Sequence, residues 1–289
     1  MLESTPKVLM TGGSGFLGKS IAKMLLEKKY SINNLINSAS SSELAQYDAY
    51  REFSYNELDK NIDADIIIHC ATNYGRDNSP YKKIFQPNLY LPLQLLIERM
   101  QNDHPLVFIN IDTSLESKTS LYALSKNLFL ASAEKIIKEH QLKKIKFINI
   151  KLEHFYGSNA PSNNFITYLT QSMQAGSPKI DLTLGEQQRD FIYIQDVVNA
   201  ISIIINEMKS FDDGVTKFEI GSGENITIKD AVLTIADLIL YDRKNLNFGA
   251  VPYRKNEQMI SEVSLSKIKQ LGWLPKYSFA EGIKEMLKK

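Results

Sequence analysis

The sequence reads Thr11-Gly12-Gly13-Ser14-Gly15-Phe16-Leu17-Gly18 where an apolar run at residues 7–11 gives way to a segment with helical spacing of its apolar residues. The glycines at 13, 15 and 18 match the pattern G-x-G-x-x-G, and those at 12, 15 and 18 match G-x-x-G-x-x-G. Glycine suits such a turn because a side chain would keep the backbone from a pyrophosphate, whose charge the helix N-terminus attracts. We expect a dinucleotide to contact Gly12, Gly13, Ser14, Gly15, Phe16, Leu17 and Gly18; the alternative is a purely structural turn.

Short apolar runs alternate with longer helical patterns through the first half of the chain. The predicted strands lie at 7–11, 32–37, 64–71, 106–111 and 145–152, and the predicted helices at 16–29, 81–101 and 121–140. Such alternation is typical of βαβ units. We therefore expect an α/β fold with a doubly wound parallel sheet, the Rossmann arrangement.

The pattern changes after about residue 155, where loops rich in Asn, Ser, Pro and Gly separate shorter elements. Helices are predicted at 163–175, 195–207, 228–241 and 279–288, and a strand at 217–220. We expect a dinucleotide-binding domain at 1–155, with a returning segment near 191–222, and a smaller, mainly substrate-binding domain at 156–289. Ligands of open α/β sheets bind at the carboxyl ends of the strands, so we expect the smaller domain to close over that edge.

The composition excludes several classes of protein. The 289 residues include 34 basic and 33 acidic side chains, for a net charge of +1, so we expect neither a nucleic-acid nor a membrane partner. One cysteine and four scattered histidines give no disulfide framework and no metal-ligand spacing, so no metal is expected. No signal-like N-terminus and no apolar run near 18 residues is present, which favours a cytoplasmic protein.

The end of the second predicted strand reads Leu35-Ile36-Asn37-Ser38 and contains no carboxylate. In sites that select NAD, an acid about 20 residues beyond the glycines binds the ribose 2′-hydroxyl. Without that acid nothing repels a 2′-phosphate, and the neutral donors Asn37, Ser38 or Ser40 can bind one, with Arg51 reaching in from a loop. We therefore expect NADP(H) rather than NAD(H).

A tyrosine and a lysine lie four residues apart in Tyr122-Ala123-Leu124-Ser125-Lys126. This spacing places both on one helix face, but a surface pair on an amphipathic helix has the same spacing. The position of the pair favours a site, because its helix follows the strand that ends in Asp112-Thr113-Ser114. Phenol, ammonium and hydroxyl should meet at the sheet edge where a nicotinamide would lie.

The chemistry of this group suits proton transfer. An ammonium at about 4 Å should lower the pKa of the Tyr122 phenol toward neutrality. Tyr122 could then exchange a proton with a ketone or alcohol oxygen while hydride moves between cofactor and carbon. Lys126 would also hold the nicotinamide ribose, and Thr113, or Ser114 if the register differs by one, would hydrogen-bond the same oxygen.

Further motifs accompany the glycine turn and the Tyr122–Lys126 pair. They are His69-Cys70-Ala71-Thr72 at a strand end, Asn88 opening a long helix, Phe155-Tyr156-Gly157, Gly185-Glu186-Gln187-Gln188-Arg189-Asp190-Phe191-Ile192-Tyr193-Ile194-Gln195-Asp196-Val197-Val198, and Leu271-Gly272-Trp273-Leu274-Pro275. Over nearly the whole chain, this set resembles the extended short-chain dehydrogenase/reductase family. The resemblance is to its nucleotide-sugar branch, the NAD-dependent epimerases and dehydratases.

The resemblance implies roles for further residues. Those near the cofactor would be Cys70, Ala71 and Thr72; those near the substrate would be Arg189 and Arg254 at the diphosphate, Glu257 at the nucleotide ribose, Asn163, Asn164 and Phe165 along the nucleotide channel, and Tyr74 and Arg76 beside the sugar. Three structural alternatives stand beside these roles: an Arg189–Asp190 ion pair, an exposed acid at Glu257, and a surface loop at 74–76. His69 and Cys70 are expected to pack beneath the cofactor rather than to react.

Within this branch the sequence favours one reaction. Thr113 is followed by Ser114 and Leu115 rather than by the Asp-Glu pair of the 4,6-dehydratases, and the acid typical of epimerases is missing after the second strand. The chain looks most similar to the CDP-abequose and CDP-paratose synthase subgroup of 4-ketoreductases, which implies reduction of a CDP- or dTDP-linked 4-keto-6-deoxyhexose for deoxysugar and O-antigen precursors. The alternatives are a 4-epimerase with tightly bound NAD and a non-catalytic NAD(P)-sensing protein. By the same analogy, helices 88–101 and 121–140 would pair two copies into a homodimer.

Overall fold

The computed structural model describes residues 6–36, 43–58, 62–76, 79–101, 104–139 and 144–288. The chain folds into two compact units. The N-terminal unit comprises Met1–Lys151 and Ile201–Phe218, and the C-terminal unit comprises Leu152–Ala200 and Glu219–Lys289. The change in pattern after residue 155 predicts a first domain at 1–155 with a returning segment near 191–222, whereas the observed bounds follow the packing of the backbone.

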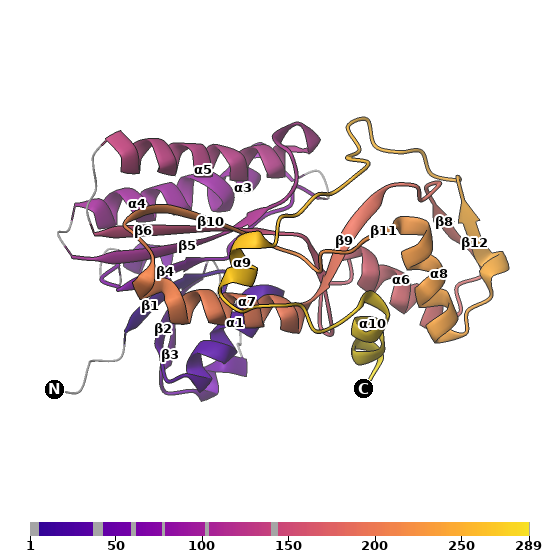
Figure 1. Ribbon diagram of the computed structural model, residues 1–289, viewed down its shortest axis with the longest axis horizontal. Coiled ribbons are helices and arrows are strands. Elements are labelled where there is room, and N and C mark those ends of the chain that lie inside the picture. The colour runs from indigo at the N-terminus through magenta and orange to yellow at the C-terminus, as the bar shows by residue number, and fades with distance from the viewer. Residues whose placement is uncertain are drawn as a thin grey trace. The chain divides into compact units, whose positions relative to one another are not determined.

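The N-terminal unit is built on a twisted sheet. Its strands are β1 (Lys7–Thr11), β2 (Ser31–Ile36), β3 (Tyr50–Ser54), β4 (Ile66–His69), β5 (Leu106–Thr113), β6 (Ile145–Leu152) and β10 (Gly214–Ile220). In the described part of the chain these seven strands lie in the order β10-β6-β5-β4-β1-β2-β3 (Figure 1). The pairs β3–β2, β2–β1, β1–β4 and β4–β5 are parallel, which confirms the predicted Rossmann arrangement.

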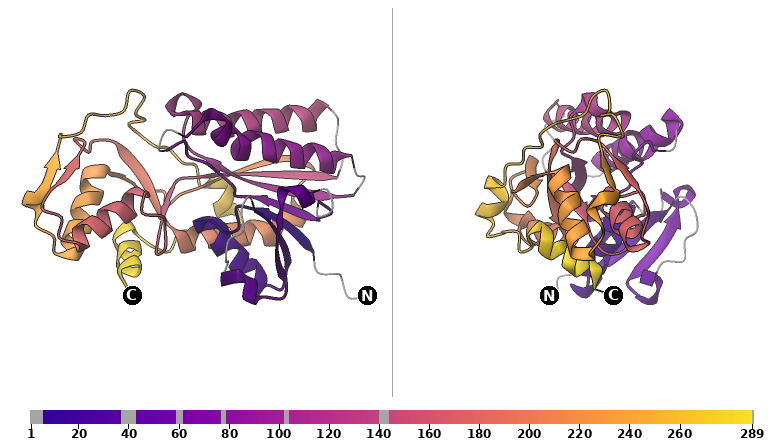
Figure 2. Two further views of the ribbon diagram at one scale, coloured as in Figure 1. Left: turned by 180° about the vertical axis from the view of Figure 1, so that it is seen from behind. Right: turned by 90° about the vertical axis from the view of Figure 1, so that its right-hand side faces the viewer.

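Helices cover both faces of this sheet. They are α1 (Phe16–Glu27), α3 (Tyr81–Phe85), α4 (Leu91–Met100), α5 (Leu121–Glu139) and α7 (Ile194–Glu207). Helices α3, α4 and α5 lie on one face, and α1 lies on the other with the end of α7, as the front and back views show (Figures 1 and 2). The Lys28 ammonium after α1 donates to the Asn206 side chain of α7 at 2.8 Å.

Two features of this unit differ from the sequence expectation. β3 was not predicted, because at the sheet edge only Tyr50 and Phe53 are buried and charged residues stand between them. Arg51 therefore lies in a strand and not in the expected loop. The helix predicted at 81–101 is interrupted by a π-turn, Gln86–Tyr90, which contains Pro87. Proline lacks the N–H that a regular helix needs.

The core beneath α5 is aromatic. The Phe108 and Phe147 rings of β5 and β6 stack at 5.3 Å between centroids, and the Phe129 ring of α5 packs on both at 5.9 and 5.8 Å. All three side chains are fully buried. Because these contacts join strands to a helix, they fix the height of α5 above the sheet.

The C-terminal unit has its own small sheets and core. Among its described residues, β7 (His154–Tyr156), β9 (Gln188–Tyr193) and β11 (Asn225–Thr227) form a sheet in the order β11-β9-β7, and β8 (Ile180–Leu182) pairs with β12 (Leu246–Phe248). The helices are α6 (Phe165–Gln174), α8 (Ile228–Ile239), α9 (Ser266–Gln270) and α10 (Phe279–Leu287). Tyr156 donates to the Phe279 carbonyl at 3.0 Å, and Trp273 is 1% exposed, so the C-terminal segment is part of the core.

Replacing Phe129 by Ala should lower the free energy of unfolding by about 3–5 kcal/mol, because the change removes a fully buried ring and leaves a cavity. Leu240, which is 92% exposed directly after α8, provides the control. Leu240→Ala should change the free energy by less than about 1 kcal/mol. Urea unfolding followed by circular dichroism measures both; equal losses would contradict this account of the core.

Candidate active site

The glycine turn lies between β1 and α1 and presses against the segment after β4. Gly12 has a φ of +72°, and a Cβ built on it would lie 2.6 Å from the Ala71 nitrogen. A Cβ on Gly18 would lie 2.0 Å from the Gly12 carbonyl oxygen. The backbone at both positions therefore requires glycine, which gives the turn a compact shape that an exposed loop would not need.

The residues of the turn lead directly into the start of α1. Gly15 is the N-cap of α1, and the first turn of that helix contains no acidic side chain. The backbone N–H of Gly13 donates to the Asn34 side chain of β2 at 2.9 Å, which ties the turn to the second strand. Free N–H groups and the helix dipole at such a position attract an anion. These residues fit the pyrophosphate of a dinucleotide.

The segment 70–73 is held on both sides. The Cys70 N–H donates to the Thr11 carbonyl at 3.0 Å, and the Ala71 N–H donates to the Thr11 hydroxyl at 3.2 Å. On the other side, the Asn88 side chain accepts from the Thr72 hydroxyl at 2.9 Å and donates to the Asn73 carbonyl at 2.8 Å. This segment is thus fixed between the glycine turn and the helices over the sheet.

Asn88 connects this segment to α5. Its side chain donates to the Ser125 hydroxyl at 3.0 Å and is fully buried. The residue does not open a helix, as the sequence suggested, because α3 already begins at Tyr81 and Asn88 lies in the π-turn. A wider turn gives the side chain room to reach two neighbouring segments.

Tyr122 lies in the first turn of α5 and is half-buried. The Thr113 side chain at the end of β5 and the Thr72 side chain lie close enough to its phenol to lower its pKa. The structure thus places Tyr122 beside Thr113, one of the two hydroxyls that the sequence left open; Ser114 follows the end of the strand. Because Thr72 belongs to the segment beside Gly12, the phenol and the glycine turn are parts of one connected arrangement.

The expected effect of Lys126 on Tyr122 is wrong for this structure. Burial raises the pKa of Tyr122, the neighbouring Tyr74 raises it further, and the nearby Thr113 and Thr72 side chains lower it only in part. The Lys126 ammonium instead donates to the Ile111 carbonyl at 2.8 Å, on β5. Tyr122 is therefore a neutral phenol throughout the physiological pH range.

Lys126 and His69 are deeply buried, and Cys70 beside them is half-buried. Lys126 is 2% exposed, and burial lowers its pKa to about 8, against the opposing influence of Asp112 and Cys70. Burial raises the pKa of the Cys70 thiol to about 12, which keeps the thiol protonated and unreactive at neutral pH. His69 is fully buried with its Nδ1 2.7 Å from the Thr11 hydroxyl, and burial holds its pKa well below the usual value. His69 therefore has a packing role.

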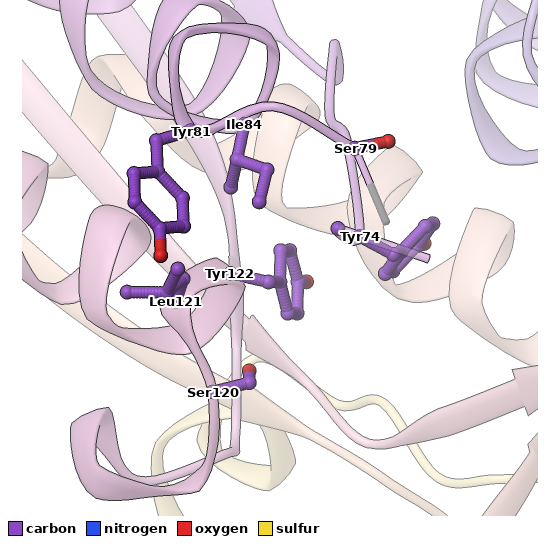
Figure 3. A pocket seen from close by; sticks show the side chains of 8 residues that line it. Tyr74, Ser79, Tyr81, Ile84, Ser120, Leu121 and Tyr122 are labelled. Carbon is purple, nitrogen blue, oxygen red and sulfur yellow. The ribbon is translucent and has the colours of Figure 1, made fainter. Parts of the chain in front are cut away.

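A pocket of about 400 Å³ opens beside Tyr122 (Figure 3). It is lined by Tyr74, Gly75, Ser79, Tyr81, Ile84, Ser120, Leu121 and Tyr122, from the loop after β4, α3 and the start of α5. The Tyr74 ring packs on Tyr122 at 4.8 Å between centroids, and the Arg76 guanidinium lies 5.2 Å from the Tyr74 ring. Tyr74 and Arg76 are thus joined to the proposed reaction site, although Tyr74 remains 43% exposed.

In the C-terminal unit, Arg189 on β9 forms an ion pair with Glu257. Both side chains are largely buried, so Glu257 is not the exposed acid considered as an alternative. Burial lowers the pKa of Arg189, and the charge of the exposed Arg254 acts in the same direction. The ion pair considered between Arg189 and its neighbour Asp190 is not observed. The Asp190 carboxylate instead accepts from the Ser222 and Gly223 backbone N–H groups at 2.6 and 2.7 Å.

The two asparagines before α6 have a clear structural part. The Asn164 side chain caps this helix by accepting from the Ile166 N–H at 3.1 Å, and it donates to the Phe155 carbonyl at 3.3 Å. Asn163 is exposed beside it, and Phe165 begins the helix. Their assignment to a nucleotide channel stays a prediction.

The structure also brings in residues that the sequence analysis did not assign to the site. Asn34 and Asp112 are buried polar side chains on strands, each beside a predicted site residue. Buried polar residues inside an apolar strand are the signal that could have found them. Asn37 and Ser38, expected near the adenosine ribose, lie outside the described residues.

The described part of the chain brings no three His, Cys, Asp or Glu side chains together as a metal site would require. None of its helices combines the length and apolar character needed to cross a membrane.

Replacing Gly12 by Ala should weaken dinucleotide binding by about 100-fold, or ~2.7 kcal/mol, because the added Cβ would collide with the backbone of the segment after β4. Gly176→Ala is a matched control, since Gly176 also has a positive φ, +67°, but a Cβ there meets nothing within 4 Å. Fluorescence titration with NADPH and with NADH measures the affinities. Equal weakening in both variants would contradict the assignment of the turn.

The family model for the NAD dependent epimerase/dehydratase family matches residues 8–221. The chain is 31% identical to the CDP-abequose synthase of Salmonella muenchen over 99% of both chains, and 24% identical to the dTDP-4-dehydro-6-deoxyglucose reductase of Escherichia coli over 97% of this chain and 96% of that protein. Its fold is similar to that of a Thermus thermophilus UDP-glucose 4-epimerase in complex with NAD, with a TM-score of 0.79, 20% identity and 97% of each chain covered. By the extent of these matches and by its sheet order, the chain belongs to the NAD dependent epimerase/dehydratase family.

Proposed function

We propose that this protein reduces the C4 ketone of a nucleotide-diphosphate-linked 4-keto-6-deoxyhexose with NADPH, in the biosynthesis of deoxysugars such as O-antigen precursors. The observation that carries the proposal is the Tyr122 phenol, which lies close to Thr113 and to Thr72 of the segment beside the glycine turn. The likeness to CDP-abequose synthases over 99% of the chain supports the substrate class, with CDP or dTDP as the nucleotide.

The residues of the N-terminal unit have separate tasks in this reaction. A bound nicotinamide coenzyme supplies the hydride that C4 receives. Tyr122 donates its proton to the C4 oxygen, and Thr113 hydrogen-bonds the same oxygen. The raised pKa keeps the phenol protonated at neutral pH, which is the form that a proton donor needs. The raised pKa thus suits reduction, since Tyr122 enters each cycle with its proton.

NADP(H) is the proposed coenzyme. The described end of β2 at Ile36 contains no carboxylate that would select NAD or repel a 2′-phosphate. Lys126 would hold the nicotinamide ribose, and the backbone of Cys70, Ala71 and Thr72 would border the coenzyme. The close approach of this segment to Gly12 supports the assignment, because it brings the segment beside the glycine turn.

The C-terminal unit supplies the proposed nucleotide contacts. Arg189 and Arg254 would bind the diphosphate, and Glu257 would accept hydrogen bonds from the nucleotide ribose. The buried pair of Arg189 with Glu257 supports this assignment, because it fixes the direction of the guanidinium. Uncharged phenols and hydroxyls line the pocket beside Tyr122, a lining suited to a neutral sugar ring.

A 4-epimerase with tightly bound NAD is the second candidate function, favoured by the structural likeness to a UDP-glucose 4-epimerase. It would interconvert two sugars with no net oxidation. A non-catalytic NAD(P)-sensing role is less well supported, since the chain keeps both Tyr122 and Lys126. A 4,6-dehydratase would need acids where Ser114 and Leu115 stand.

We also infer a homodimer through α4 and α5. Large apolar side chains on these helices remain exposed, with Ile97 at 41%, Leu121 at 39% and Leu128 at 40%. A second copy of the same helices would cover them.

Mixing the protein with NADPH and CDP- or dTDP-4-keto-6-deoxyglucose should consume NADPH, followed as loss of absorbance at 340 nm, a property of the coenzyme. Tyr122→Phe should lower kcat by about 10²–10⁴-fold, because the proton donor is lost while the ring remains. Tyr90→Phe, at a phenol that is 53% exposed, should leave the rate within about twofold.

The same material distinguishes the alternatives. A Tyr122→Phe protein as fast as the wild type would refute the assigned role of the phenol. Protein that releases stoichiometric NAD on denaturation, and interconverts two nucleotide sugars without consuming NADPH, would establish the epimerase instead.

Replacing Arg189 by Lys should raise KM for the nucleotide sugar at least about tenfold, a loss of ~1.4 kcal/mol, with kcat within threefold. Lysine keeps the charge beside Glu257 but lacks the planar pair of donors that a diphosphate takes. Arg243→Lys, at an exposed arginine paired with Asp237, is the control and should leave KM unchanged. A normal KM in Arg189→Lys would contradict the diphosphate assignment.

A further inference from the structure

A buried carboxylate, Asp112, lies at the proposed reaction site without a part in the chemistry described above. Asp112 is only 4% exposed, at the penultimate position of β5. Its Oδ1 accepts from the Thr113 N–H at 2.8 Å, and its Oδ2 accepts from the Asn149 side chain at 2.9 Å. Asn149 in turn accepts from the Asn110 side chain at 2.7 Å. A chain of buried polar groups on β5 and β6 thus ends at Asp112.

These hydrogen-bonded side chains lie on the face of the sheet that α5 covers. Alternate residues of a strand share a face, so Asn110 and Asp112 follow Phe108, on which the Phe129 ring of α5 packs. Lys126 lies one turn before Phe129 on α5, and its ammonium donates to the Ile111 carbonyl. Phe129 of α5 thus packs on Phe108 of β5, and one helical turn earlier the charged Lys126 lies near the end of β5, which carries Asp112.

Charge compensation explains why both groups can be buried. A lone buried ammonium or carboxylate is costly, and each would tend to become neutral. The ionisable groups that act on Lys126 are Asp112 on β5, Cys70 after β4 and, from the end of β4, His69. Burial keeps the Cys70 thiol protonated, with a pKa of about 12, and the lowered pKa of His69 keeps that ring neutral. Among these three groups, Asp112 is the one carboxyl group, so it is the partner that can compensate the charge of Lys126.

We propose that Asp112 is a positioning residue of the site: its carboxylate compensates the charge of the buried Lys126 ammonium and fixes the end of β5 that presents Thr113. The consequence for turnover rests on the proposed function. The effect on Lys126 concerns the ligand-free protein and is testable without a substrate.

The variant Asp112→Asn removes the charge and keeps the shape. Its amide oxygen can accept from the Thr113 N–H as before. Its amide nitrogen faces Asn149, and Asn149 and Asn110 can each turn their amides over, so that the hydrogen-bond chain persists. Asn149→Ala is the matched control, because it breaks the chain and leaves the Asp112 charge in place.

The primary readout is the titration of Lys126 by NMR in protein labelled with 13C at lysine Cε, its signal assigned by its loss in Lys126→Arg. The wild-type midpoint should lie near 8, well below the ordinary value of 10.5. In Asp112→Asn the midpoint should fall by about one to three pH units. In Asn149→Ala it should stay within about 0.3 units, although the protein is less stable.

Turnover provides the second readout. Because the ammonium is the active form, the rate of Asp112→Asn relative to wild type should fall about fivefold or more between pH 6 and pH 8. Fixing β5 alone would lower the rate equally at all pH values. Where Asp112→Asn does not fold, Asp112→Ser serves for the same titration.

Three results would overturn the proposal: an unchanged Lys126 midpoint in the charge-removing variant, an equal shift in Asn149→Ala, or a wild-type midpoint at 10.5. The proposed function fails separately. If the Lys126 midpoint falls in Asp112→Asn but the wild-type protein reduces no 4-keto sugar, the proposed reductase function is refuted and the role of Asp112 stands. If the wild-type protein reduces the sugar but the midpoint does not change in Asp112→Asn, the role of Asp112 is refuted and the reductase function stands.

Discussion

The contact of Gly12 with the backbone of Cys70 and Ala71 is the constraint on which the rest of the site depends. There is no room for a side chain at Gly12 between the ends of β1 and β4, and Thr11 accepts hydrogen bonds from both residues of the segment. Thr72, next in the chain, then lies close to the Tyr122 phenol. A backbone contact thereby determines where a reactive side chain on another helix lies.

Much of the fold could be predicted because its periodic segments are long. β1 and β6 were predicted with the bounds that the structure has, and α5 within one residue. β3 was missed because five residues at a sheet edge with two buried side chains give little periodic signal. The small strands of the C-terminal unit, three residues long in β7, β8, β11 and β12, escaped for the same reason. Such strands depend on partners distant in sequence.

The site could be predicted as a set of residues but not as an electrostatic arrangement. Spacing placed Tyr122 and Lys126 on one helix face, yet their mutual effect depends on burial, which the spacing does not report. Desolvation of the phenol outweighs the effect of the nearby Thr113 and Thr72 side chains, and Lys126 acts on groups of β4 and β5. The ion-pair partner of Arg189 could not be predicted from the sequence either, because Glu257 lies 68 positions away along the chain.

The π-turn at Gln86–Tyr90 makes α3 and α4 present different sides to the rest of the unit. One additional residue in a helix rotates everything after it by about 100°. Ile84, before the turn, lines the pocket beside Tyr122, whereas Leu91, directly after it, joins the apolar core. A continuous helix would point residues seven apart in nearly the same direction. Deleting one residue here would rotate α4 relative to α3, so that Ile84 and Leu91 could not keep both of these positions. This segment should therefore tolerate substitution better than a change in length.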